Sequence, residues 1–149
     1  MDIFCRVYDD PEAVVGVVPD STAIYNYCKN IIIKTKMERE VAIVCLAYVE
    51  RLTLMTGLRI NEVNWKRLLF ICLILASKIW DDESFENIHF AKTIPKYSLR
   101  EISEMESTFL QLIDFSLTLQ QADYAKYYFI LRTFAKSKER SFQLNALDV

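Results

Sequence analysis

Nine consecutive uncharged apolar residues, 68–76, lie within a segment of helical character, and this run limits the possible folds more than any other feature. Asn64 can cap a helix that continues through Trp80. Over about 2.5 turns such a helix is apolar on every side, so neighbouring elements must cover most of its faces. The sequence therefore predicts a central helix that is surrounded by other elements.

Apolar spacing and capping signals predict five further helices. A first helix is expected at about 21–34. A capping box of Thr35 and Glu38 is expected to open a second helix, which Gly57 ends. Both helices precede the central one in the chain.

Three later helices also have recognisable starts. Ser84 can cap a short fourth helix at about 87–93, which Pro95 ends. Capping boxes open the fifth and sixth helices, with a brief extended piece at 115–117 between them. The two boxes pair Ser98 with Glu101 and Thr118 with Gln121.

The composition supports a helical chain. Only two glycines and three prolines occur in 149 residues, too few for the many turns of an all-β fold. Hydrophobic residues make up 52% of the chain, which is enough for one domain with a sizeable core. The predicted fold class is therefore all-α.

Two kinds of partner are not expected. The net charge is -2 and no basic run is longer than two residues, so a phosphate backbone has little to attract it and nucleic acid is not a predicted partner. The longest uncharged apolar stretch is far shorter than the roughly 18 to 20 residues of a membrane span, so no transmembrane segment is predicted.

Catalytic and metal-binding patterns are mostly missing from the sequence. Four cysteines occur singly, and His89 is the only histidine, so neither a paired zinc motif nor a usual catalytic triad is expected. We interpret Cys28, Cys45 and Cys72 as core residues in a reducing compartment, whereas Cys5 has no interpretation. The prediction is a protein that is not an enzyme and has no cofactor or metal.

Two charges on separate helical segments border apolar faces. Lys78 follows Ile74 and Leu75 by one turn, and Glu106 lies beside the inward stripe of the fifth helix. Two interpretations remain open from spacing alone. Lys78 pairs locally with Asp81 or Asp82 while Glu106 is solvated, or the two charges belong to a common binding site.

The central helix opens with Trp65-Lys66-Arg67, two cations at the end where the helix dipole favours anions. Either these side chains are solvated, or they reach an acidic surface on a partner.

Several segments together resemble a known family. The segments LILASKIWDD (73–82) and EISEMESTFLQLIDFSLTL (101–119) resemble the third and fifth helices of a cyclin box, and YVERL (48–52) resembles the end of its second helix. The resemblance is closest to cyclin Y and the phosphate-pathway type cyclins, through NWKRLLF (64–70), ASKIWDD (76–82) and YAKYYFILR (124–132). It covers about residues 21–136.

The resemblance implies a five-helix cyclin box around a central third helix, plus one C-terminal helix. Residues 19–136 would form the box with the appended helix, 1–18 a loosely structured N-terminal segment and 137–149 a tail. In cyclins, the lysine and glutamate matching Lys78 and Glu106 face the kinase. The apolar residues at matching positions would supply the hydrophobic part of that contact: Leu75, Ile79, Leu110, Phe115 and Leu117.

The implied function is that of a regulatory subunit. The resemblance suggests binding and allosteric activation of a cyclin-dependent kinase of the PCTAIRE, PFTAIRE-like or phosphate-pathway type. The alternative is a cyclin-box scaffold or adaptor that does not activate a kinase. An uncovered apolar recognition face also leaves self-association open. The expected location is intracellular, in the cytoplasm, the nucleus or both, and membrane association through a further N-terminal extension stays open.

Overall fold

The computed structural model describes residues 2–4, 17–81 and 85–147. The chain divides into two compact units, Met1–Thr118 and Leu119–Val149, which are described separately. The described residues form helices and contain no strand, so the predicted all-α class is confirmed. The predicted extent of the box with its appended helix, 19–136, stays a prediction.

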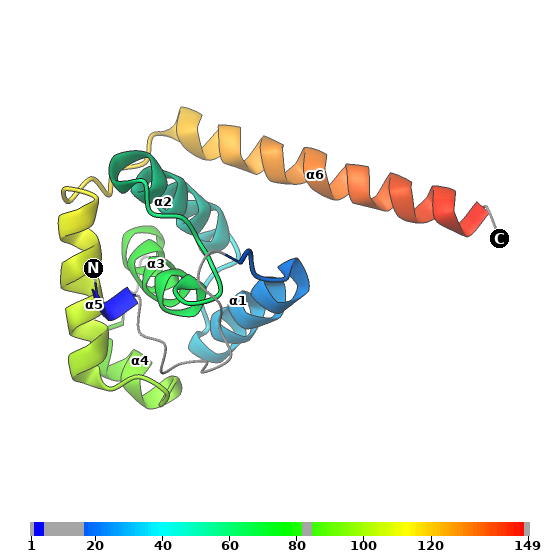
Figure 1. Cartoon of the computed structure of the whole chain (residues 1–149). Helices are drawn as coiled ribbons and strands as arrows, with labels where there is room; N and C mark the ends of the chain where they lie inside the picture. The colour runs from blue at the N-terminus through cyan, green and yellow to red at the C-terminus, as the bar shows by residue number, and fades with distance from the viewer. Residues whose placement is uncertain (1, 5–16, 82–84, 148–149) are drawn as a thin grey trace. The chain divides into compact units, whose positions relative to one another are not determined.

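Helix α3 (Trp65–Trp80) is the core of the first unit. It contacts α1 (Ser21–Thr35), α2 (Val41–Thr56) and α5 (Leu99–Leu112), which lie around it in Figure 1. The whole run 68–76 is buried, as the all-round apolar sequence predicts. Because α3 has no exposed face along this run, its charged last turn is the part that can contribute to a surface site.

Two smaller elements complete this unit. Helix α4 (Asn87–Thr93) contacts α5 and α1, and the short 3-10 helix η1 (Asp2–Phe4) contacts α5. The Phe4 ring packs edge-on against Phe109, with ring centroids 6.5 Å apart. Ile3 and Phe4 are buried, so these residues differ from the loosely held segment expected at 1–18.

The predicted helix boundaries agree closely with the structure where the capping chemistry was identified correctly. The Ser98 hydroxyl accepts a hydrogen bond from the Glu101 backbone N–H, and the Glu101 carboxylate accepts one from the Ser98 N–H, so this capping box is confirmed. Gly57 ends α2 at φ +74°, a conformation that glycine adopts without a Cβ clash. The predicted cap Ser84 lies outside the described residues.

Two other predicted capping boxes are wrong. Thr35 is the last residue of α1, and its buried hydroxyl donates to the Ile31 carbonyl instead of capping α2, which begins at Val41. The chain between them turns through Lys36 at φ +57°, which keeps Thr35 within the core. Helix α6 begins at Gln121, so Thr118 is not its N-cap.

Asn64 precedes α3, as predicted, but its side chain does not cap the helix. Its Oδ1 accepts a hydrogen bond from the Asn61 N–H at 2.9 Å, and its Nδ2 donates to the Arg59 carbonyl at 2.9 Å. Asn64 therefore fastens the preceding loop to the start of the central helix.

The second unit consists of α6 (Gln121–Leu147). The helix continues through Leu147, and residues 137–147 contain no proline or glycine to stop it. Among the helices of the described residues, none combines the length and the apolar character that crossing a membrane requires.

Candidate partner-binding site

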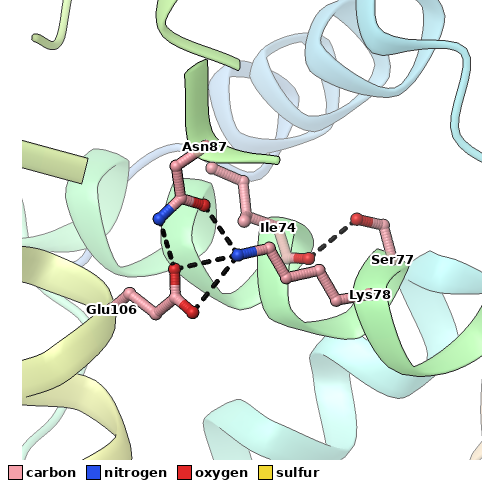
Figure 2. A network of polar contacts seen from close by, with 5 residues as sticks. All are labelled: Ile74, Ser77, Lys78, Asn87 and Glu106. Atoms are coloured by element: carbon pink, nitrogen blue, oxygen red, sulfur yellow. Dashed lines mark hydrogen bonds and ion pairs between the residues drawn. The ribbon is translucent and has the colours of Figure 1, made fainter. Parts of the chain in front are cut away.

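Lys78 and Glu106 meet at the end of the central helix, together with Asn87 (Figure 2). The Lys78 Nζ lies 3.0 Å from Glu106 Oε2 and 3.2 Å from Oε1, and it donates to Asn87 Oδ1 at 2.7 Å. The Asn87 amide Nδ2 in turn donates to Glu106 Oε2 at 2.6 Å. The three side chains therefore form a closed network that joins α3, α4 and α5.

Asn87 suits this place because its amide has one acceptor and one donor end. The carbonyl oxygen faces the ammonium and the NH₂ group faces the carboxylate, so each end meets its electrostatic complement. Asn87 is not among the predicted site residues, because an asparagine at the start of a short helix carries no distinctive spacing signal.

The network sits at the boundary between core and solvent. The side chains of Lys78 and Glu106 are 24% and 21% exposed, so neither is an ordinary solvated charge. The interpretation of Glu106 as a solvated residue is therefore wrong. The Lys78 ammonium bonds to Glu106 on α5 and Asn87 on α4. Of the two residues in the local alternative, Asp81 and Asp82, the second lies outside the described residues.

A surface hollow of about 310 Å³ adjoins the network. One face of α5 forms its floor, because positions 103, 106, 107 and 110 follow the helical repeat. The hollow has a polar end and an apolar end. Its lining comprises Asn87, Ser103, Glu106, Ser107, Leu110 and Phe115. It therefore offers hydrogen-bonding groups and apolar surface side by side, the usual composition of a protein-recognition site.

The predicted apolar contact residues differ in exposure. Ile79 is exposed, Leu110 and Leu117 are half-buried, and Phe115 is 65% exposed. Leu75, in contrast, is buried in the core and is not part of the exposed surface. Leu110 and Phe115 share the hollow with Glu106, so the structure brings together three of the seven predicted site residues there, with Lys78 directly bonded to one of them.

Phe115 lies in a turn, and the predicted extended piece at 115–117 is wrong at this residue. Asp114 and Phe115 have φ values of +52° and +55°. The Phe115 N–H donates to the Leu110 carbonyl at 2.8 Å, and the Ser116 N–H donates to the Ile113 carbonyl at 3.0 Å. The end of α5 therefore folds back on itself and leaves the Phe115 ring at the surface.

A second ion pair joins the start of α3 to the start of α5. The Arg67 guanidinium lies 3.5 Å from Glu101 Oε1 and 5.0 Å from the centroid of the Tyr97 ring. Arg67 is buried, so both interpretations offered for it, solvation and contact with a partner, are wrong. Hydrogen bonding from the Ser98 backbone N–H, assisted by Arg67, lowers the pKa of Glu101.

Cys45 and Cys72 are buried in the core as interpreted, whereas Cys28 is only half-buried; Cys5 lies outside the described residues. Burial raises the pKa of Cys28 to about 12, and a hydrogen bond with Cys72 together with burial raises that of Cys45. The Cys28 and Cys45 thiols are therefore neutral at pH 7. Within the described ranges, no three histidine, cysteine or acidic side chains are grouped so that they could hold a metal ion.

The first unit is all-helical and is built around the buried helix α3. The family model described as Cyclin matches residues 11–117, which is more than half of the chain. The chain belongs to the cyclin family. Cyclins are regulators without catalytic activity of their own, which agrees with the prediction that this protein is not an enzyme.

Proposed function

We propose that this chain is the regulatory subunit of a cyclin-dependent protein kinase, which it binds and activates through the face formed by the ends of α3 and α5. The proposed kinase is of the PCTAIRE, PFTAIRE-like or phosphate-pathway type, because the segments at 64–70, 76–82 and 124–132 most resemble the cyclins of those kinases. The observation that carries the proposal is the Lys78–Glu106–Asn87 network beside the hollow with Leu110 and Phe115.

The polar part of the network supports contact with a partner's backbone. Lys78 and Glu106 neutralise each other, so the cluster presents donors and acceptors without a net charge. A peptide segment supplies both carbonyl and N–H groups, and a neutral, preorganised cluster binds these with little loss of side-chain freedom. A strongly charged partner group would instead compete with one member of the pair.

The apolar part supplies the hydrophobic contact. Ile79 and Phe115 are exposed large apolar side chains, and Leu110 and Leu117 are partly accessible beside them. Covering such side chains removes apolar area from water, and a few central anchors of this kind usually dominate the binding energy. Leu75 is buried below this surface and supports it from within the core.

The mechanism is allosteric. A protein kinase is active only when a lysine–glutamate ion pair in its small lobe and its metal-binding aspartate are both in place, and the position of one helix controls that arrangement. A partner that binds the active position better shifts the population toward it, by no more than its differential affinity. The cyclin supplies this difference in affinity and performs no chemical step.

Substitution of Lys78 tests the site directly. Loss of one member of a desolvated interfacial charge pair costs roughly 2 to 5 kcal/mol. The Lys78→Ala variant should therefore bind a PCTAIRE-type kinase well over tenfold more weakly by calorimetry. The matched control is Lys34→Ala, at an exposed position in the last turn of α1, which should bind as the unmodified chain does. Normal binding by a folded Lys78→Ala protein would refute the site.

A kinase assay on the same complex separates activation from scaffolding. The bound kinase should gain activity toward a peptide substrate, and the gain should fall in parallel with occupancy for Lys78→Ala. A stable complex in which the kinase activity is unchanged would favour the adaptor alternative.

A further inference from the structure

The turn at residues 113–117 has a backbone conformation that its own sequence does not favour. Asp114 and Phe115 both lie in the left-handed region. An aspartate tolerates this region, but a bulky residue such as Phe115 rarely adopts it, because Cβ then crowds the backbone carbonyl. Such conformations persist where the surrounding structure holds them, and they concentrate at functional sites. Backbone hydrogen bonds at the end of α5, from the Phe115 N–H to the Leu110 carbonyl and from the Ser116 N–H to the Ile113 carbonyl, stabilise the turn in part, and contacts from other elements add to them.

Two side chains of α2 bind the far end of this turn. The Tyr48 hydroxyl donates to the Leu117 carbonyl oxygen at 2.8 Å, and the Arg51 Nη1 donates to the Ser116 carbonyl oxygen. Tyr48 and Arg51 are one helical turn apart, and the guanidinium lies 5.9 Å from the centroid of the Tyr48 ring. The two donors therefore act from one place on α2, on consecutive carbonyl groups.

Both ends of the turn are thus anchored to the core. Tyr48 and Ile113 are fully buried, so the donor hydroxyl and the first residue of the turn have fixed positions. Burial raises the pKa of Tyr48 to about 12, so the hydroxyl keeps its proton at every physiological pH. Between these anchors the Phe115 ring projects to the surface beside the hollow.

We infer that Tyr48 and Arg51 are positioning residues that hold the 113–117 turn in its strained conformation and so present Phe115 and Leu117 to the partner. This inference rests on the proposed function, because it assigns a role to two of the proposed contact residues. Without the two donors, the backbone at Phe115 relaxes toward negative φ, and the ring leaves the place where it borders the hollow.

The test removes the two donors and keeps the packing. In the double variant Tyr48→Phe, Arg51→Met, the ring and the aliphatic stem remain while both hydrogen bonds are lost. Its affinity for a PCTAIRE-type kinase should fall about tenfold, as expected for two bonds of ordinary strength. The matched control is Thr53→Val, which removes another hydroxyl-to-carbonyl bond of α2, from Thr53 to Val49 at 3.1 Å, and should bind normally.

A measurement without the kinase isolates the turn. The backbone amide NMR signals of Ser116 and Leu117 should move in the double variant and stay in place in Thr53→Val. Arg51→Lys keeps one donor, so it should lose less affinity than Arg51→Met.

The outcomes distinguish this inference from the proposed function. If Lys78→Ala weakens binding but the folded double variant binds normally, the positioning role is wrong and the proposed site stands. If Thr53→Val weakens binding as much as the double variant, the loss follows general stability and the positioning role is refuted. If Lys78→Ala binds normally while the double variant is weakened, the Lys78 site is wrong and the turn remains a binding element.

Discussion

Two ion pairs join α3 to α5, and they differ in what surrounds the cation. Near the start of both helices, Arg67 meets Glu101; further along, Lys78 meets Glu106. Arg67 is 4% exposed and its guanidinium lies over the Tyr97 ring, whereas the Lys78 ammonium lies beside an open hollow. The difference lies in the cations: Arg67 is buried although its partner Glu101 is 31% exposed, whereas Lys78 and Glu106 are 24% and 21% exposed at the edge of the hollow.

The two ion pairs therefore differ in the role that each can have. The Arg67 side chain is enclosed by α3, α5 and Tyr97, so it has no surface to offer and serves to hold the two helices together. The Lys78 network is complete without a partner, yet it borders apolar groups that are exposed. Ion pairs between the same two helices can thus be structural or available for recognition, according to burial.

The largest expected effect is a loss of unfolding free energy when the Arg67–Glu101 pair is broken. Glu101→Ala removes both the capping box of α5 and the partner of a buried cation. The Arg67 charge stays in the core after its Glu101 contact is lost, and because Glu101 itself is 31% exposed the cost should be about 2 kcal/mol, below that of a fully buried pair. Chemical denaturation should show a loss of unfolding free energy of this size, while the affinity of the folded fraction for the kinase stays unchanged.

The double variant Arg67→Met, Glu101→Gln is the control for this prediction. It removes both charges together, keeps an aliphatic side chain of similar length at 67, and retains a capping acceptor at 101. We expect it to be more stable than Glu101→Ala. Equal stability of the two variants would show that the charge retained at Arg67 is not the cause of the loss.

The family pattern placed Lys78 and Glu106 in one predicted site without predicting that they pair, and no pattern predicted the Arg67–Glu101 pair. The resemblance singled out Lys78 and Glu106, and the structure brings them together. Arg67 was visible as a cation in the first turn of an apolar helix, an unfavourable place for the helix dipole. That signal indicates a need for a compensating anion, but it does not say which helix supplies it, because helix packing decides the partner.

The same reasoning applies to the secondary structure. The run 68–76 predicts a buried helix because no other arrangement hides an apolar surface on all sides. The capping box at Ser98 is confirmed, whereas the similar spacing at Thr35 is not, because there the hydroxyl binds back into α1. The strained turn at Phe115 had no local signal, since its conformation depends on donors from α2.

Acidification should lower the unfolding free energy that the Arg67–Glu101 pair contributes, by less than the Glu101→Ala substitution does. The pKa of Glu101 is lowered in the folded protein, so ionised Glu101 contributes stability that is fully present above its unfolded-state pKa, near 4.5. This contribution is lost as the pH falls through the lower folded-state pKa. We expect the unfolding free energy to fall as this contribution is lost, measured by denaturation at a series of pH values below 5.

Glu101→Gln removes this titration and keeps a capping side chain, so its stability should fall less steeply below pH 5. Glu104→Gln, at an exposed position of the same helix, is the matched control and should retain the full acid dependence. If both variants lose stability in parallel with the unmodified chain, Glu101 is not the group responsible.

The smallest expected effect is the loss of unfolding free energy when the Lys78–Glu106 pair is broken. Lys78→Met keeps the aliphatic stem and removes the ammonium, leaving Glu106 with the Asn87 amide and access to solvent. Partly exposed pairs contribute little, so the unfolding free energy should fall by less than about 1 kcal/mol. Kinase binding should nevertheless fall well over tenfold, since the ammonium is lost from the proposed interface. A stability loss as large as that of Glu101→Ala would mean that both pairs are structural, and the distinction between them would fail.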